Sequence, residues 1–190
     1  VAAAAHAPGG AQNTNSGTAG DDSATARRGA SAAADHKFAA EAATGGRAEV
    51  ELGRLAAEKG ASDEVRQFGR RMVDDHTKAD EELTRLASAK GMTLPAAPDP
   101  RRSSEAQKLS ALAGEKFDRE YVRMMIKHHR KSVGDFQKEA ERGADPDLKA
   151  FAARTLPALR EHLRMIQRIS DKMALRKSGH LKDANSNTNR

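Results

Sequence analysis

Four long segments of this chain repeat small and apolar residues every three or four positions, which is the spacing of one face of an α-helix. Short polar turns at Gly60 and Gly143 separate the first segment from the second and the third from the fourth. The predicted helices run from about Asp35 to Lys59, Ser62 to Lys90, Glu115 to Arg142 and Pro146 to Met173. No segment alternates as a β-strand does, so the pattern predicts an all-α protein.

The connection between the second and third helices is longer than the other two and contains Pro95, Pro98 and Pro100. A short helix is expected after it, beginning at Ser103 or Ser104. Because short turns force neighbouring helices to be antiparallel, we predict an up-down-up-down four-helix bundle over residues 34–176. In that topology both tight turns lie at the same end of the bundle.

Both ends of the chain have a different composition. Residues 1–33 are rich in Gly, Ser, Thr, Asn and Ala, and we expect a disordered linker there. Ala5-His6-Ala7 fits the small-x-small cleavage site of a secretory signal peptide, which predicts export. Residues 177–190 are predicted to form a disordered basic tail.

Composition excludes several classes of function. The chain has no cysteine, so disulfides and zinc-thiolate sites are excluded. The net charge is +6, but bases alternate with acids along the helices, and no specific nucleic-acid partner is predicted. A weak association with anionic membrane surfaces is expected from this charge, and a homo-oligomer stays open. No apolar run is long enough to span a membrane.

One polar residue interrupts the apolar face of each long helix. These residues are Glu49, His76, His129 and His162. Counted from the nearest tight turn, they fall within roughly 10 Å of one another along the bundle axis. Buried polar groups cost stability unless they satisfy one another or bind a ligand. We therefore predict a polar layer across the bundle.

Two interpretations of this layer stay open. In one, Glu49 and the imidazoles form a structural hydrogen-bond network. In the other, they bind a single Fe, Cu or Zn ion, because bundles build metal sites from side chains on facing helices. The Glu-x-x-His pairs of a diiron site are missing, which disfavours ferroxidase chemistry. The further candidate ligands are His128, Met72, Met125, Asp118 and His36, the last two as a second layer near the far end.

Several motifs in order resemble one bacterial family, the domain-of-unknown-function 4142 family. They are Phe38, Glu49-Val50, Met72-Val73-Asp74-Asp75-His76, Phe117-Asp118-x-x-Tyr121-Val122, His129 and Leu156-Pro157-x-Leu159-x-x-His162. The resemblance covers about Asp35 to Lys172 and implies a ferritin-like four-helix fold and a periplasmic or envelope location. Members are often labelled outer-membrane proteins. Met124-Met125-x-x-His128-His129 also resembles, in part, a related family of small exported Met/His bundles.

No established activity comes with this resemblance, so its motif residues carry over only as family positions. We favour an exported, non-catalytic envelope protein, related to stress, whose bundle binds a metal or a partner. The first alternative is a ferritin-like, metal-dependent oxidoreductase. The second is a purely structural or interaction module.

Overall fold

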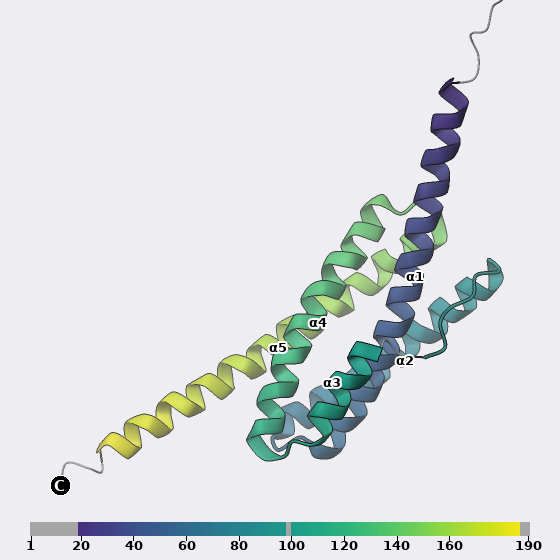
Figure 1. Cartoon of the computed structure of the whole chain (residues 1–190). Helices are drawn as coiled ribbons and strands as arrows, with labels where there is room; N and C mark the ends of the chain where they lie inside the picture. Colours follow the sequence, from purple (N-terminus) through teal and green to yellow (C-terminus); the bar gives the residue numbers. More distant parts are fainter. Residues whose placement is uncertain (1–18, 98–99, 187–190) are drawn as a thin grey trace, which may run out of the picture.

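The computed structural model of the chain describes residues 19–97 and 100–186, and within these ranges all regular structure is helical (Figure 1). The helices are α1 (Ala19–Lys59), α2 (Asp63–Ala89), α3 (Pro100–Ser110), α4 (Gly114–Arg142) and α5 (Pro146–Ser186). The predicted all-α four-helix bundle with a long second connection is confirmed. α3 is the short helix expected in that connection.

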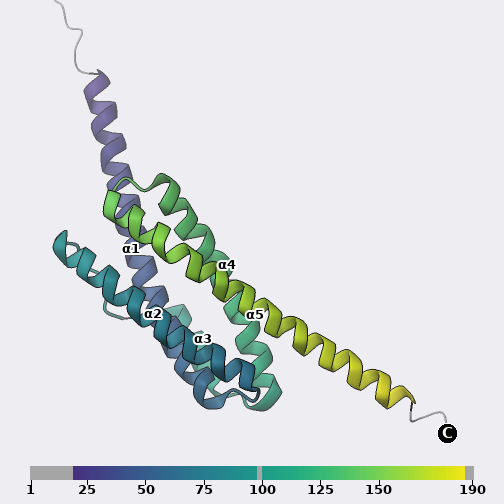
Figure 2. The same ribbon diagram turned by 180° about the vertical axis from the view of Figure 1, so that it is seen from behind.

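The four long helices form two antiparallel hairpins, α1 with α2 and α4 with α5, as Figures 1 and 2 show from opposite sides. α3 runs back along the bundle and contacts both α1 and α4. At the crossing of α1 and α2, a Cβ atom on Gly53 would lie 2.8 Å from the carbonyl oxygen of Gly69. Because such a contact is too short for any side chain, glycine at this position permits the close approach that packs α2 against α1.

The tight turns lie at opposite ends of the bundle, which corrects one part of the predicted topology. At one end, Asp118, near the start of α4, accepts hydrogen bonds from the backbone N–H groups of Ala61 and Ser62 in the α1–α2 turn, both at 2.8 Å. At the other end, Asp35 of α1 accepts hydrogen bonds from the backbone of Ala144 and Asp145 in the α4–α5 turn.

It follows that α4 runs parallel to α2 and α5 parallel to α1 (Figure 1). The physical reason is the long connection. Because α3 carries the chain back along the bundle, α4 starts at the end where α1 stopped. The short turns force antiparallel neighbours only within each hairpin.

Both predicted disordered tails are in part helical. α1 begins at Ala19, so residues 19–33 are helical, and α5 continues to Ser186 through most of the predicted basic tail. These parts of α1 and α5 project from the bundle (Figure 2). Alanine, lysine and arginine are strong helix formers, and adding a residue to an existing helix avoids the cost of nucleation. Residues 1–18 and 187–190 lie outside the described residues.

The apolar core is divided into two clusters. One lies toward the α1–α2 turn and includes Leu52, Met72, Met125 and Ile166, all fully buried. The other lies toward the α4–α5 turn and is built around Phe38, Leu83, Phe136, Phe151 and Leu159. On every long helix, the residue of the predicted polar layer lies between the members of the two clusters.

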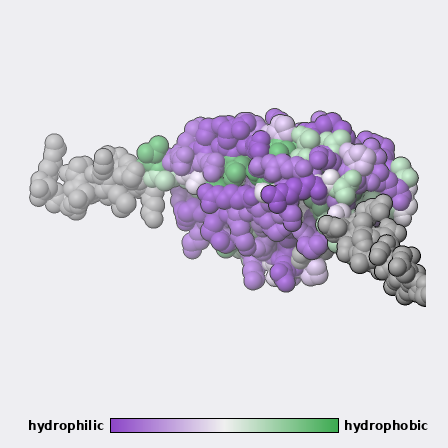
Figure 3. Space-filling model, turned by 90° about the horizontal axis from the view of Figure 1, so that it is seen from above, coloured by the Kyte–Doolittle hydropathy of each residue, from purple (hydrophilic) through white to green (hydrophobic). Residues whose placement is uncertain are grey.

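The surface of the bundle is polar. The face in Figure 3 is mostly hydrophilic, with small apolar areas between the helices. Across the described part of the chain, no helix combines the length and the apolar character that crossing a membrane requires.

Candidate metal centre

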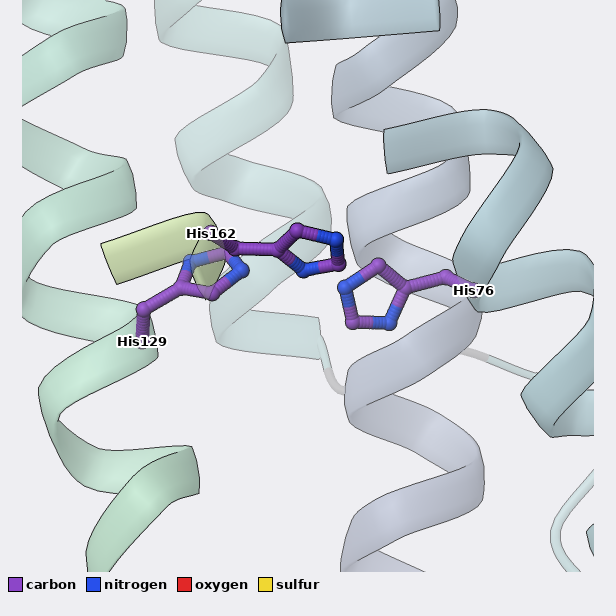
Figure 4. A group of neighbouring side chains, drawn as sticks. All are labelled: His76, His129 and His162. Carbon is purple, nitrogen blue, oxygen red and sulfur yellow. The ribbon is translucent and has the colours of Figure 1, made fainter. Parts of the chain in front are cut away.

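Three imidazoles meet in the layer between the two apolar clusters. His76 of α2, His129 of α4 and His162 of α5 point toward one another across the bundle (Figure 4). Each offers one ring nitrogen, and the three nitrogens lie within 4.8 Å of one another. The ring centroids are 5.5–5.8 Å apart, so the rings form a nearly equilateral triangle. Among the described residues, this is the only group of three or more His, Asp or Glu with such spacing.

The outer nitrogens of two of these imidazoles are held by hydrogen-bond acceptors. His129 Nδ1 lies 2.9 Å from the carbonyl oxygen of Met125, and His162 Nε2 lies 2.8 Å from Oδ2 of Asp75. A carbonyl accepts hydrogen bonds and cannot donate them, so His129 carries its proton on Nδ1. An ionised Asp75 likewise places the proton of His162 on Nε2.

The inner nitrogens of His129 and His162 therefore carry lone pairs. His129 Nε2, His162 Nδ1 and His76 Nε2 are all buried, and the described residues offer none of them a hydrogen-bond partner. Two acceptors cannot hydrogen-bond to each other. A species with positive charge or with protons to donate, such as a metal ion or a water molecule, would satisfy the converging lone pairs.

Glu49 of α1 lies at the edge of the triangle. Its Oε2 is 3.0 Å from His76 Nε2, but the pair is not aligned as a hydrogen bond. Arg102 Nη1 of α3 lies 3.6 Å from Oε1 of the same carboxylate. Two ligands on one ion lie roughly 3–4 Å apart, so the spacing of Glu49 and His76 is that of neighbouring ligands. Three of the four predicted residues thus converge, and the fourth contacts one of them.

The electrostatics keep the site ready for a cation. Burial lowers the pKa of His76, and it lowers the pKa of His162 to about 4 despite the hydrogen bond to Asp75. Burial alone would raise the pKa of Glu49, but the positive charge that the neighbouring imidazoles gain when acid protonates them, together with that of Arg102, outweighs burial and lowers that pKa. At neutral pH His76 and His162 are therefore neutral and Glu49 is ionised, which are the forms that coordinate metals.

The further candidate residues lie in different places. Met72 and Met125 are buried in the apolar cluster beside the layer. His128 is buried on α4 and contacts Glu105 instead of the triangle. The predicted second layer of Asp118 and His36 is wrong. Asp118 caps the α1–α2 turn, whereas His36 is exposed and adjoins Asp35 near the opposite turn, because the two turns lie at opposite ends.

Sequence reasoning missed four residues around the site. Asp75 orients His162, and the signals for it in the sequence were its position next to His76 and its place in the motif from Met72 to His76. Arg102 and Glu105 come from α3, where nothing in the sequence indicates a contact with the layer. Tyr121 was named only as a member of the motif that begins at Phe117. Its buried hydroxyl has no hydrogen-bond partner among the described residues, and burial, then the charge of Glu49, raises its pKa.

A family profile described as domain of unknown function (DUF4142) matches residues 20–169. The chain belongs to the DUF4142 family. The match spans the bundle and contains every member of the polar layer. No curated protein sequence is similar enough to the chain to count as a match.

Several solved structures share the fold. A DUF305 fragment from Deinococcus radiodurans is similar with a TM-score of 0.65 and 16% identity, over 73% of this chain and 96% of that one. A candidate secreted DUF305 protein from Streptomyces coelicolor has a TM-score of 0.61 and 18% identity, over 72% and 91%. CopM in its Cu(I)-bound form has a TM-score of 0.62 and 16% identity, over 73% and 96%. At these identities the likeness establishes the helical-bundle fold.

Proposed function

We propose that this protein is an exported helical bundle that binds a single transition-metal ion, with copper as the first candidate. The observation that carries the proposal is the set of three converging imidazoles, each with a buried nitrogen that has no hydrogen-bond partner within the described part of the chain. His76, His129 and His162 would supply three nitrogen ligands, and Glu49 would supply an oxygen. Small shifts of these side chains would bring the nitrogens from within 4.8 Å to the roughly 3–4 Å of a loaded site.

Copper is favoured by the donors and by the fold. Imidazole suits Cu, Zn, Fe and Ni, and a given nitrogen and oxygen site binds Cu(II) more tightly than the other divalent ions of the first row. CopM, which shares the fold, has Cu(I)-bound and Cu(II)-bound forms. Export is supported by the cleavage pattern at Ala5-His6-Ala7 and by the candidate secreted neighbour. Holding the ion in a buried site fits sequestration or carriage of metal in the cell envelope.

The alternative of a ferritin-like oxidoreductase is less well supported. A diiron centre needs several carboxylates that bridge and flank two ions. The polar layer contributes Glu49, and the described residues provide no second cluster with ligand spacing.

The test is a titration of metal-free, untagged protein with Cu(II) and with Zn(II), followed by calorimetry and thermal unfolding. We expect one ion per chain. At a free metal concentration of 100 times the Kd, stability should rise by about 2.7 kcal/mol. His162→Gln keeps a polar group of similar reach but should abolish this binding.

His36→Gln is the matched control, because His36 is exposed and remote from the layer. The purely structural interpretation predicts no metal-dependent stabilisation. It also predicts that His162→Gln shifts stability by only about 1–3 kcal/mol. Unchanged stoichiometry in the His162 variant would refute the site.

A further inference from the structure

The metal centre is approached from one side by a cavity. This cavity has a volume of about 490 Å³, and residues of α1, α3 and α4 line much of it. Glu49 and His76 reach its wall, whereas His129 and His162 do not. A metal ion that travels through the cavity would therefore meet Glu49 and His76 before the other two imidazoles.

His128 stands in the wall of the same cavity. It follows Lys127 and precedes His129 on α4, and successive helical residues point about 100° apart, so His128 faces the cavity while His129 faces the triangle. Only 6% of His128 is exposed. Its Nε2 lies 2.8 Å from Oε2 of Glu105, while its Nδ1 is buried and has no hydrogen-bond partner among the described residues.

Glu105 links this imidazole to solvent. It lies on α3, its side chain is 31% exposed, and its Oε1 is 3.5 Å from Nζ of Lys127. Together Glu105 and His128 offer one carboxylate and one imidazole, and the described residues add no third ligand with metal spacing. Two ligands bind an ion weakly. Weak binding is what a transfer position requires, because the ion has to leave again.

Glu49 connects this pair to the triangle. It lines the same cavity as Glu105 and His128, and its Oε2 lies 3.0 Å from His76 Nε2. Arg102 Nη1 also lies 3.3 Å from the carbonyl oxygen of Gly45, so α3 holds its guanidinium beside Glu49. Donor groups thus follow one another from solvent to the centre: Glu105, His128, Glu49 and His76.

We infer that Glu105 and His128 form a loading site, a transient binding position for the transition-metal ion on its way to the centre. This inference rests on the proposed function, because it needs a centre that binds the ion. The ion is bound first by the partly exposed carboxylate of Glu105 and the imidazole of His128. The ion then passes to Glu49 and His76. Together with His129 and His162, these residues form a larger set of ligands, which binds the ion more tightly than the loading site does.

The single tyrosine of the chain makes the loading rate measurable. The chain has no tryptophan, and Tyr121 and His129 both lie 6.2 Å from the ring of Phe68. Cu(II) quenches nearby fluorophores, so its arrival at the centre should quench Tyr121 fluorescence. Metal-free protein is mixed with Cu(II) chloride in a stopped-flow instrument, and the second-order rate constant is measured for the wild type, His128→Gln and Glu105→Gln.

We expect both variants to load at least about tenfold more slowly than the wild type and to bind one ion in the end. Asp135→Asn is the matched control, because Asp135 lines the same cavity but pairs with Lys131. Its rate should equal that of the wild type. Glu105→Gln also guards against misfolding of the His128 variant, since Glu105 is half-buried on the short helix.

Two results would overturn the loading site. Unchanged rates in both variants would show that the ion takes another path. Loss of the bound ion at equilibrium would make His128 a ligand of the final centre. Failure of the proposed function looks different, because the wild type itself would then bind no ion at equilibrium, and the loading site would fall with it.

Discussion

The two ends of the bundle and its middle all bury charged or ionisable side chains, but they satisfy them differently. At the ends, Asp118 and Asp35 each accept backbone hydrogen bonds from the opposite hairpin's turn. In the middle, three imidazoles direct unpartnered nitrogens at one another. Burial alone therefore does not separate a structural polar residue from a ligand. The unsatisfied atoms make that distinction, because native proteins leave few of them without a reason.

Glu139 is the exception at the α4–α5 end. Its Oε1 is buried without a hydrogen-bond partner among the described residues. Burial, together with the charges of Asp35 and Asp145, raises its pKa to about 7. A carboxyl group that can take up a proton avoids most of the cost of this position. His76 and His162 have no such remedy at neutral pH, because burial lowers the pKa values of their imidazoles.

The largest loss of stability is expected when a buried carboxylate that accepts backbone hydrogen bonds is replaced. Asp118→Ala removes the acceptor of two backbone N–H groups in the α1–α2 turn. Each hydrogen bond to a charged group contributes about 1.5–3 kcal/mol, and a buried donor without a partner is costly. We expect the free energy of unfolding to fall by about 4 kcal/mol in urea denaturation. Asp35→Ala should behave in the same way, and a loss below 1 kcal/mol in both would remove the contrast between ends and middle.

Acid should destabilise the metal-free protein because of the buried histidines in its middle layer. The pKa of His162 is about 4 in the folded protein, below its ordinary value of 6.5. As pH falls from 6.5 toward 4, the unfolded chain therefore takes up a proton that the folded chain resists, and stability decreases. A tenfold difference in proton affinity corresponds to about 1.4 kcal/mol, so the loss should approach about 3 kcal/mol near pH 4.

Urea denaturation at pH 7, 5.5 and 4.5 measures this loss. The lowered pKa values of Glu49 and Asp75 keep both carboxylates ionised in the folded chain over this range. Glu139, whose pKa is raised to about 7, takes up a proton in the folded chain first and opposes the loss, so the contribution of His162 is obtained by comparing the wild type with His162→Gln. His162→Gln should reduce the slope of stability against pH. A slope equal to that of the wild type would mean that His162 is not held neutral.

Much of this arrangement was predictable from local sequence. The apolar faces of the helices placed Leu52, Met72, Met125 and Ile166 in the core, and they are fully buried. The height of the polar layer was also predictable, although the direction of α4 was not. His129 lies midway between Gly114 and Gly143, so reversing the helix leaves it at the same level.

What local sequence could not supply is the relation between distant elements. The direction of α4 depends on how α3 crosses the bundle, and short-range periodicity carries no information about that crossing. Asp75, Arg102 and Glu105 act on residues of other helices through contacts that only the assembled bundle creates. The helical parts of the predicted tails, residues 19–33 and 177–186, were missed because their polar composition outweighed their helix propensity in our prediction.

The smallest expected effect is a gain in stability. It is the most direct test of the contrast between the middle of the bundle and its ends. His129 is fully buried. Among the described residues its Nε2 has no hydrogen-bond partner, and its Nδ1 bonds to the Met125 carbonyl, which the helix already engages. Leucine has a similar volume and no polar atom to leave unsatisfied. Replacing buried polar groups by apolar ones of similar shape is often neutral or stabilising.

His129→Leu should therefore raise the stability of the metal-free protein by about 1 kcal/mol and remove metal binding. Asp118→Leu, a similar exchange at a satisfied position, should lose about as much stability as Asp118→Ala. Both variants are compared with the wild type by urea denaturation in the presence of a chelator. A His129 variant that is less stable by more than about 2 kcal/mol would show that the imidazole is satisfied within the fold. The buried polar groups in the middle of the bundle would then be satisfied within the fold, as they are at its ends, and the metal centre would lose its main support.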